Sequence, residues 1–392
     1  MAAAKHRLLS GPAGEAAQGS QASPLSRAAR PRLGVAGCGW VARNGYAPHL
    51  GADLDGAFLP GPCLDLDRNL AHDYAAATGG WAVDGLDRLA SESDAVLVAT
   101  PNSSHLDLAL RLSALGRHCL VEKPVCIAVD QAEALCRASR ATGILLKSGA
   151  VCRHRADTLW LLQRVPRLGA VRRIRLVWRR ARGIPAKAWH LLPSGGWTGV
   201  LPDLGYHMID LAGAILGFPE GECRVEQARA ATAQGAAADW YGGDDALRCA
   251  VPSEVVLAAR VGGTRVDLDV AWSGDGSGDR TGIVVEGESG TLSLEGLFGF
   301  SGAALRSCCS CRLADLDGRV VEEARFPIGP DLQIEAFGRL LEEFARDLEE
   351  MPVAAREVEI RFAAHFLQVT TQAISDLTPA RVDEDMISRP GE

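Results

Sequence analysis

Short apolar runs separated by longer stretches with helical spacing fill the first third of the chain. The runs lie at 33–36, 94–100, 119–121 and 144–146, and they suit strands that are buried on both faces. A stretch between them, 106–115, repeats its apolar residues with a helical period. Strands that alternate with helices predict βαβ units and a parallel sheet, which is the α/β class.

The pattern changes after residue 153, from buried runs to alternation. In the segment 171–178 the apolar residues Ile174, Leu176 and Trp178 take every second position, so they share one face of a strand. The opposite face carries three arginines, which are Arg173, Arg175 and Arg179. One apolar face and one charged face predict a half-buried strand in an open-faced sheet. We interpret the arginine face as a solvated or intersubunit surface; the alternative is that it holds a phosphorylated substrate.

The remainder of the chain continues this mixed pattern. Strand-like segments with turns between them extend from 223 to 294, and amphipathic helices are predicted at 334–348 and 358–374. The first 31 residues are rich in Ala, Gly, Ser and Gln and lack periodicity, so we expect them to be disordered. The expected division is therefore a disordered tail at 1–31, a first domain at 32–153 and a second domain at 154–392.

A glycine-rich turn follows the first apolar run, within residues 32–42 (R-L-G-V-A-G-C-G-W-V-A). Gly37 permits a tight turn, and Gly39 allows the backbone to approach a pyrophosphate closely. The residues after Gly39 can open a helix, whose N-terminus offers N–H groups and a partial positive charge to that phosphate. Ala42 stands where the third glycine of the dinucleotide-binding fingerprint often stands, which the fingerprint allows. The stretch predicts a dinucleotide site, and its alternative is a strand–helix turn that binds nothing.

The second strand, predicted at 61–65, ends in an acid. Asp65 follows Gly37 by 28 positions, beyond the usual spacing of about 20. A carboxylate there accepts hydrogen bonds from both ribose hydroxyls and repels a 2′-phosphate, so it favours NAD over NADP. The alternative is a turn aspartate on the surface, since Asp67 is close by.

Composition and charge narrow the function classes. The 392 residues are 47% apolar and 23% charged with a net charge of −8, which is ordinary for a globular protein and argues against a nucleic-acid partner. No apolar run is long enough to span a membrane, and no secretory segment is found. We interpret the 11 cysteines as reduced thiols of a cytoplasmic protein. No metal site is expected, because Cys308, Cys309 and Cys311 have no second ligand cluster nearby.

Three polar residues stand at positions that suit chemistry. Lys123 belongs to an E-K-P turn at the carboxyl end of the predicted strand 119–121, and parallel sheets bind ligands at that end. Asp203 and His207 are four residues apart in a predicted helix, so they share one helical face. A histidine paired with an acid is a candidate acid/base group. The alternatives are a solvated loop lysine and a structural histidine.

Four motifs together resemble the glucose–fructose oxidoreductase / inositol dehydrogenase / rhizopine-catabolism family, known as Gfo/Idh/MocA. They are G-C-G-W-V-A, A-T-P-N-S-S-H, E-K-P and D-L-G-Y-H-M-I-D, in this order, and the resemblance extends from residue 32 to about residue 382. It implies an N-terminal Rossmann domain and a C-terminal α+β domain with a large, mostly antiparallel, open-faced sheet. It also implies an NAD(P)-dependent oxidoreductase of sugars or cyclitols, which forms a homodimer or homotetramer through that sheet.

The resemblance assigns roles to residues of this chain. The catalytic residues it implies are Lys123, Asp203 and His207. The coenzyme site it implies consists of Gly37, Cys38, Gly39, Trp40, Val41, Asp65, Thr100, Pro101, Asn102, His105, Glu122 and Lys123. Further candidates for the substrate pocket are Arg153, Trp189 and His190, together with Asp203. The loop 195–199 reads G-G-W-T-G where relatives often carry three consecutive glycines, and a proline precedes the acid, so the substrate is left open.

We therefore expect hydride transfer between NAD, with NADP as the second choice, and a secondary alcohol of a sugar or cyclitol. His207 would take the hydroxyl proton, and Lys123 would stabilise negative charge on the oxygen. Asp203 would bind a neighbouring hydroxyl and orient His207. Two alternatives are an NAD-dependent glycoside hydrolase that oxidises its substrate transiently and a non-catalytic sugar-sensing regulator. The presence of all three polar residues argues against the regulator.

Overall fold

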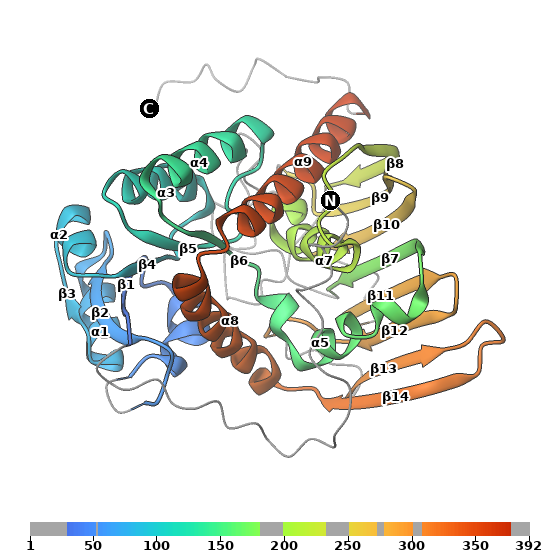
Figure 1. Ribbon diagram of the computed structural model, residues 1–392, viewed down its shortest axis with the longest axis horizontal. Coiled ribbons are helices and arrows are strands. Elements are labelled where there is room, and N and C mark those ends of the chain that lie inside the picture. Colours follow the sequence, from blue (N-terminus) through green and yellow to red (C-terminus); the bar gives the residue numbers. More distant parts are fainter. Residues whose placement is uncertain are drawn as a thin grey trace, which may run out of the picture.

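The computed structural model describes residues 30–51, 54–180, 199–232, 251–272, 278–300 and 308–377. The tail expected at 1–31 lies outside the described residues except for its last two positions. The described chain forms two sheets that lie at opposite sides of the molecule, with helices between and around them (Figure 1).

The first sheet contains six parallel strands in the order β3-β2-β1-β4-β5-β6. They are β1 (Arg32–Ala36), β2 (Leu59–Leu64), β3 (Trp81–Ala82), β4 (Ala95–Val98), β5 (His118–Glu122) and β6 (Leu146–Gly149). Strand β1 pairs with both β2 and β4, so the strand order reverses beside it. This is the switch point at which sheets of this kind bind ligands. The predicted α/β class with a Rossmann-like sheet is confirmed.

Helices connect these strands and cover both faces of the sheet. They are α1 (Arg68–Thr78), α2 (Leu86–Ser91), α3 (His105–Ala114) and α4 (Val129–Thr142), with short 3-10 turns η2 (Ala47–His49) and η3 (Asn102–Ser104). Local sequence signals set their ends. The Asp67 carboxylate accepts the N–H of Asn69 at 2.9 Å and caps α1, which ends at Gly79 with φ of +82°.

The second sheet contains eight strands in the order β14-β13-β12-β11-β7-β10-β9-β8. They are β7 (Val171–Arg179), β8 (Cys223–Ala231), β9 (Glu254–Val261), β10 (Thr264–Ala271), β11 (Arg280–Gly287), β12 (Thr291–Gly296), β13 (Cys308–Ala314) and β14 (Val320–Pro327). All neighbours are antiparallel except β7 and β10, which run parallel. The predicted large, mostly antiparallel sheet is confirmed.

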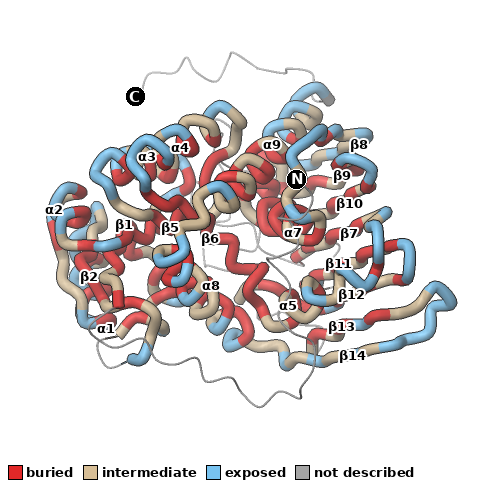
Figure 2. The backbone as a smooth tube through the Cα atoms, in the orientation of Figure 1, coloured by how far each residue is buried: buried red, intermediate tan, exposed pale blue. Residues whose placement is uncertain are grey.

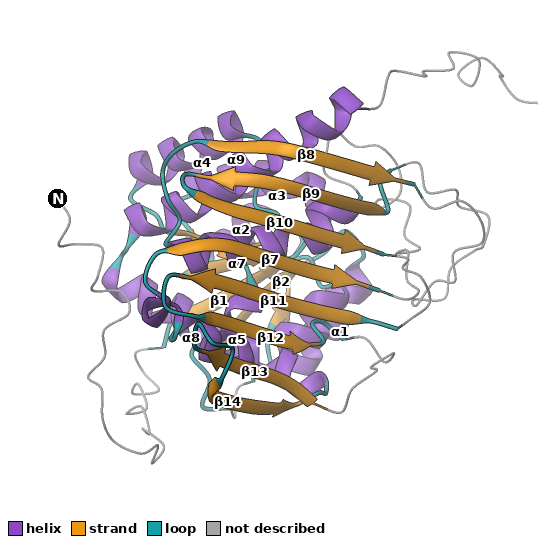
Figure 3. Ribbon diagram, turned by 90° about the vertical axis from the view of Figure 1, so that its right-hand side faces the viewer, coloured by secondary structure: helices purple, strands orange, loops and turns teal. Residues whose placement is uncertain are grey.

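Figure 3 shows that helices cover one face of this sheet and leave the other face open. On the covered face the side chains of Ile174, Leu176 and Trp178 are buried, as their alternation predicts. The open face (hereafter the outer face) carries the three arginines of β7, each paired with an acid. These ion pairs are Arg173–Asp267 at 2.6 Å, Arg175–Glu286 at 2.5 Å and Arg179–Asp269 at 2.5 Å.

The remaining helices lie between the two sheets or along the covered face of the second. They are η4 (Val151–His154), α5 (Ala156–Leu162), η5 (Val165–Leu168), α7 (Tyr206–Leu216), α8 (Pro330–Glu350) and α9 (Val353–Leu377). Helices α8 and α9 return to the first sheet: Phe344 stacks on Phe58 with ring centroids 5.6 Å apart, and α9 contacts β6 and α4. Two helices of the expected second domain thus also pack against the first part of the chain.

The larger of two apolar clusters extends across both parts of the molecule. It includes Leu33 and Val35 of β1, Ile174 of β7, and Phe337 and Phe344 of α8. Figure 2 shows this buried material as a continuous band through the centre, while the far ends of β13 and β14 are exposed. No helix of the described residues combines the length and the apolar character needed to cross a membrane.

Candidate active site

The glycine turn after β1 has two glycines with different surroundings. Gly37 has a φ of +91°, and a Cβ built on it would lie 2.6 Å from the carbonyl carbon and oxygen of Ala99. Its N–H donates to the carbonyl of Leu64 at 2.8 Å. A Cβ on Gly39, in contrast, would meet no atom within 4 Å. The structure thus needs a glycine at 37 for the fold, whereas Gly39 leaves open space next to the backbone.

Asp65 lies directly beside this turn, at the end of β2. Its carboxylate accepts the backbone N–H of Cys38 at 2.7 Å and that of Asp67 at 2.9 Å. The side chain is half-buried, so it keeps contact with solvent. An acid fixed next to the glycine turn is in the place where Rossmann sheets hold the ribose hydroxyls of a dinucleotide.

A cavity of about 320 Å³ opens at the carboxyl end of the first sheet. The first part of the chain contributes Gly39, Trp40, Val41, Ala99, Thr100, Pro101, Asn102, His105, Glu122, Lys123, Val151 and Cys152. The later part contributes Trp178, Arg180, Asp203, Leu204, His207, Gly299, Phe300, Gln333 and Phe337. The structure therefore brings nine predicted coenzyme residues into one cavity with all three predicted catalytic residues. Gly37, Cys38 and Asp65 lie at the adjoining glycine turn.

Lys123 and Asp203 form an ion pair inside this cavity. The ammonium of Lys123 donates to Oδ1 of Asp203 at 2.9 Å and to the main-chain oxygen of the same residue at 3.3 Å. The other carboxylate oxygen, Oδ2, accepts the indole N–H of Trp272 at 2.8 Å. The spacing of four residues suggested His207 as a partner of Asp203. The structure adds Lys123 and Trp272 as two donors to its carboxylate.

His207 is buried beside the ring of Trp178, with the ring centroids 5.4 Å apart. It lies one residue into α7, directly after the wider π-helical turn η6 (Leu201–Gly205), which holds Asp203. Burial and the positive charge of Lys123 lower the pKa of His207 well below 6.5, against the opposing effect of Asp203. The imidazole is therefore neutral near pH 7 and can accept a proton.

His105 and Glu122 hold the loops around the cavity. The two ring nitrogens of His105 lie 2.9 Å from the carbonyl of Pro124 and 2.8 Å from that of Thr100, so this buried ring bridges two loops. Glu122 accepts the Tyr46 hydroxyl at 2.6 Å and the N–H of Lys123 at 3.1 Å. Burial raises the pKa of Glu122 above its usual value.

Three further residues, Arg153, Trp189 and His190, were predicted to belong to the substrate pocket. Arg153 is not among the residues that line the cavity; its guanidinium is buried and pairs with Asp210 at 2.9 Å and Glu359 at 2.7 Å. Its surroundings are those of a structural ion pair. Trp189 and His190 lie outside the described residues.

Sequence reasoning missed several residues of this site. The cavity wall includes Trp178, Arg180, Phe300 and Gln333, and Trp272 reaches Asp203 from behind the wall. Of these only Trp178 carried a signal, because its alternation with Leu176 predicts a residue on the covered face of the sheet. The others follow strand ends or start a helix, and no motif marks them.

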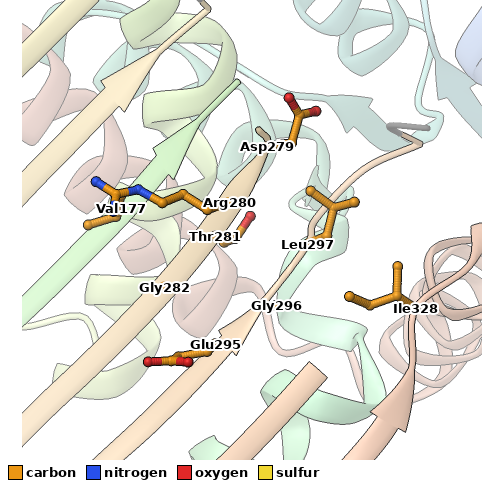
Figure 4. A pocket seen from close by; sticks show the side chains of 9 residues that line it. All are labelled: Val177, Asp279, Arg280, Thr281, Gly282, Glu295, Gly296, Leu297 and Ile328. Carbon is orange, nitrogen blue, oxygen red and sulfur yellow. The ribbon is translucent and has the colours of Figure 1, made fainter. Parts of the chain in front are cut away.

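A second cavity, of about 230 Å³, lies on the second sheet and shares no residue with the first. Figure 4 shows Arg280 and Glu295 on neighbouring strands along its edge. Gly282 leaves space in this cavity, because a Cβ built on it would meet only the carbonyl oxygen of Leu294, at 3.9 Å. It contains none of the predicted site residues. No group of three or more His, Cys, Asp or Glu side chains among the described residues is arranged to hold a metal ion.

The residues present fit a bound nicotinamide dinucleotide. The open space at Gly39 leaves room for a pyrophosphate against the backbone, and a Cβ would fill that space. The Asp65 carboxylate beside the same turn suits ribose hydroxyls. The cavity continues from Gly39 to Lys123 and His207, so the redox end of such a coenzyme has polar groups next to it.

Comparisons with known proteins agree with this geometry. Residues 32–149 match the GFO_IDH_MocA family, described as an oxidoreductase family with an NAD-binding Rossmann fold. The chain is 33% identical over 279 residues to a protein assigned as the UDP-kanosamine synthase oxidoreductase subunit of Amycolatopsis mediterranei (strain S699), covering 69% of this chain and 76% of that protein. It is 30% identical over 197 residues to D-glucoside 3-dehydrogenase of Escherichia coli (strain K12), covering 48% and 54%.

Solved structures share the fold. The 3-ketoreductase KijD10 of Actinomadura kijaniata, in complex with NADP and TDP-benzene, superposes with a TM-score of 0.69 at 19% identity, covering 88% of this chain and 98% of that one. GenD2 from gentamicin A biosynthesis, in complex with NAD, also has a TM-score of 0.69, at 22% identity over 93% and 98%. The chain thus belongs to the Gfo/Idh/MocA family and is an NAD(P)-dependent oxidoreductase of sugar or cyclitol hydroxyl groups.

Proposed function

We propose that this enzyme interconverts the 3-hydroxyl and 3-keto forms of a hexose that carries a phosphate or nucleoside diphosphate. The printed activities of several relatives support the 3-position: besides the glucoside enzyme, they include glucose-6-phosphate 3-dehydrogenase and UDP-N-acetylglucosamine 3-dehydrogenase. The observation that carries the proposal is that His207 and the Lys123–Asp203 pair line the same cavity as Gly39. Arg180 in the cavity wall favours an anionic group on the substrate.

His207 is the proposed proton acceptor in the oxidation direction. A bound nicotinamide supplies the site that takes or gives the hydride. The neutral imidazole of His207 takes the proton of the reacting hydroxyl, and in the reverse direction its imidazolium returns that proton to the oxygen. Burial and Lys123 keep the pKa of His207 low, so the ring is unprotonated near neutral pH.

Lys123 and Asp203 are proposed to act as a unit. The Lys123 ammonium stabilises negative charge that develops on the substrate oxygen as the proton leaves. Asp203 holds the ammonium by two contacts, from Oδ1 at 2.9 Å and from its main-chain oxygen at 3.3 Å. The Lys123 side chain is 17% exposed, so solvent competes little for its charge.

We further propose NAD as the preferred coenzyme. The carboxylate of Asp65 is fixed at the glycine turn by the N–H of Cys38, with an O···N distance of 2.7 Å. A carboxylate in this place binds two ribose hydroxyls and repels a 2′-phosphate. In this proposal residues 32–153 bind the coenzyme, and residues 154–392 bind the substrate and form the subunit interface.

The outer face of the second sheet is the proposed interface of a homodimer or homotetramer. This face carries ion pairs such as Arg175–Glu286, and it contains the cavity lined by Val177. We propose that a second copy of the chain covers this surface. The cytoplasm is the proposed location, because all ten cysteines within the described residues are free thiols. Light scattering at micromolar concentration tests the oligomer, and a monomeric mass contradicts it.

Coenzyme reduction by a panel of substrates tests the proposed reaction. The purified full chain is mixed with NAD and with a nucleoside-diphosphate glucose, glucose 6-phosphate, a methyl glucoside and inositols, and NADH absorbance is followed. A phosphorylated or nucleotide-linked hexose is expected to react best. Its 3-deoxy analogue should be inert, whereas the 2-deoxy or 4-deoxy analogue should still react.

Other outcomes would change the assignment. Reaction of the 3-deoxy analogue at an unchanged rate would move the reacting carbon elsewhere. Release of the leaving group from a glycoside without accumulation of NADH would instead support transient oxidation by an NAD-dependent glycoside hydrolase.

A further inference from the structure

Trp272 is the largest side chain that is fully buried in the described part of the molecule, with an exposed fraction of 0%. It directly follows β10, the strand that runs parallel to β7 in the middle of the second sheet. Its backbone is held in place, because its own N–H donates to the carbonyl of Ser253 at 2.9 Å. The indole N–H reaches Oδ2 of Asp203 at 2.8 Å.

The two oxygens of the Asp203 carboxylate thus have different partners. Oδ2 faces the indole of Trp272, whereas Oδ1 accepts the ammonium of Lys123 at 2.9 Å. A carboxylate that is held at one oxygen by a rigid ring cannot rotate freely about its own axis. The direction in which it offers Oδ1 to Lys123 is therefore set by Trp272.

An indole is suited to this position for two reasons. Its N–H is a donor that does not titrate, and it stabilises the charged form of the carboxylate over the neutral form. It brings no charge of its own, so it leaves the electrostatics of the cavity to the charged and titratable side chains that line it. Besides Asp203 these are Lys123, Arg180, His207, His105, Glu122 and Cys152. Trp272 does not itself line the cavity, and its indole N–H contacts the cavity wall at Asp203.

We propose that Trp272 is a positioning residue that locks the Asp203 carboxylate and thereby aims the Lys123 ammonium at the substrate oxygen. This inference rests on the roles proposed above for Lys123 and Asp203. It differs from a purely structural role for a buried ring, because it depends on one hydrogen atom of that ring rather than on its volume.

Replacing that hydrogen without changing the volume gives the sharpest test. Site-specific incorporation of 3-benzothienylalanine at position 272 substitutes sulfur for the indole N–H and keeps the bicyclic shape. We expect kcat to fall by about tenfold or more, as for a lost hydrogen bond to a charged group, with the NAD dissociation constant unchanged. The low-pH fall of kcat/KM for oxidation, which also depends on a charged Asp203 to hold Lys123, should begin at a higher pH, because the Asp203 carboxylate loses a donor that favours its charged form.

Trp160 of α5 provides a matched control. Its ring packs on the guanidinium of Arg164, with the cation 3.9 Å from the ring centroid, and it lies outside the cavity. The same replacement at position 160 should leave kcat and the pH limb unchanged. For the Trp272 replacement, a lower kcat with an unmoved pH limb would indicate only a structural role and would overturn the proposal. An unchanged kcat with an unmoved pH limb would overturn it as well.

An NMR measurement tests the contact without relying on turnover. With ¹⁵N-labelled tryptophan, the indole N–H signal of Trp272, assigned by its loss in Trp272→Phe, should shift as Asp203 titrates. The shift should vanish in Asp203→Asn. If the wild-type enzyme oxidises no sugar but this titration is seen, the proposed function fails and the contact stands. If turnover is normal but the signal does not follow Asp203, the positioning role is wrong.

Discussion

Lys123 and Asp203, which are 80 positions apart in the chain, form a 2.9 Å ion pair that joins the two parts of the molecule at the cavity. Lys123 follows the end of β5 in the first sheet, whereas Asp203 lies in the helical turn before α7. A pair of this kind makes the site complete only when both parts have folded and packed together. Several consequences can be measured.

Replacement of His207 by Ala should lower kcat by about 100-fold or more, because a positioned acid/base group contributes at least this factor. Coenzyme affinity, measured by fluorescence titration, should stay within twofold, because the coenzyme motifs are on the first sheet. The exposed His72 of α1 provides the control, and His72→Ala should behave as wild type. Near-normal turnover of the His207 variant would transfer the proton role to another group.

The pH dependence should follow from the low pKa of His207. Burial and Lys123 hold this pKa well below 6.5, so the ring is neutral above that pH. Oxidation needs the neutral ring, and kcat/KM for oxidation should be flat above pH 6.5 and fall only at lower pH. Reduction needs the protonated ring, so its kcat/KM should decrease as the pH rises. An oxidation limb centred above pH 7 would contradict the assignment of His207.

Replacement of Asp65 by Ser should narrow the preference for NAD over NADP. The change removes the charge that repels a 2′-phosphate, and it also removes an acceptor for ribose hydroxyls. We expect kcat/KM for NAD to fall and that for NADP to rise, measured with one sugar at fixed concentration. Asp84→Ser, at an exposed position, is the control. A wild-type enzyme that prefers NADP tenfold would show that Asp65 does not choose the coenzyme.

The two glycines of the turn should respond differently to an added methyl group. In Gly37→Ala the new Cβ would lie 2.6 Å from the Ala99 carbonyl, so we expect a melting temperature lower by several degrees and loss of NAD binding. In Gly39→Ala the Cβ enters open space, so the melting temperature should be unchanged. NAD should nevertheless bind about tenfold more weakly, because the methyl group occupies the place of the pyrophosphate. Equal NAD binding by Gly39→Ala and the wild type would remove this glycine from the coenzyme site.

Arg153 should matter for stability rather than for substrate binding. Arg153→Met removes the cation nearest to the buried Asp210 and one partner of Glu359, whose pKa Arg153 helps to lower to about 2. Breaking such a buried pair costs about 3–5 kcal/mol, measurable by urea unfolding. The exposed Arg68→Met is the control. A selective rise in KM for the sugar, with normal stability, would return Arg153 to the substrate pocket.

The strands of the first sheet, the glycine turn and the half-buried strand β7 could all be predicted from sequence, because each depends on residues close together in the chain. The run before Gly37 must be a buried strand, since its side chains are apolar on both faces, and the alternation at Ile174 and Trp178 leaves one face for the core. Lys123 could be placed at the carboxyl end of a strand for the same reason. Local patterns of apolar and polar residues therefore determine the helices and strands, and they indicate the edge of the sheet at which ligands bind.

Only the tertiary structure decided what those residues touch. Trp272 donates to Asp203 across 69 positions, Arg153 turns away from the cavity to Asp210, and α8 returns from the end of the chain to the first sheet. Sequence spacing places Asp203 and His207 on one helical face, but it does not indicate Lys123 and Trp272 as donors to this carboxylate, because packing alone brings them within reach. Contacts between distant segments depend on how whole elements pack and on the burial of charge, and no local period in the sequence records them.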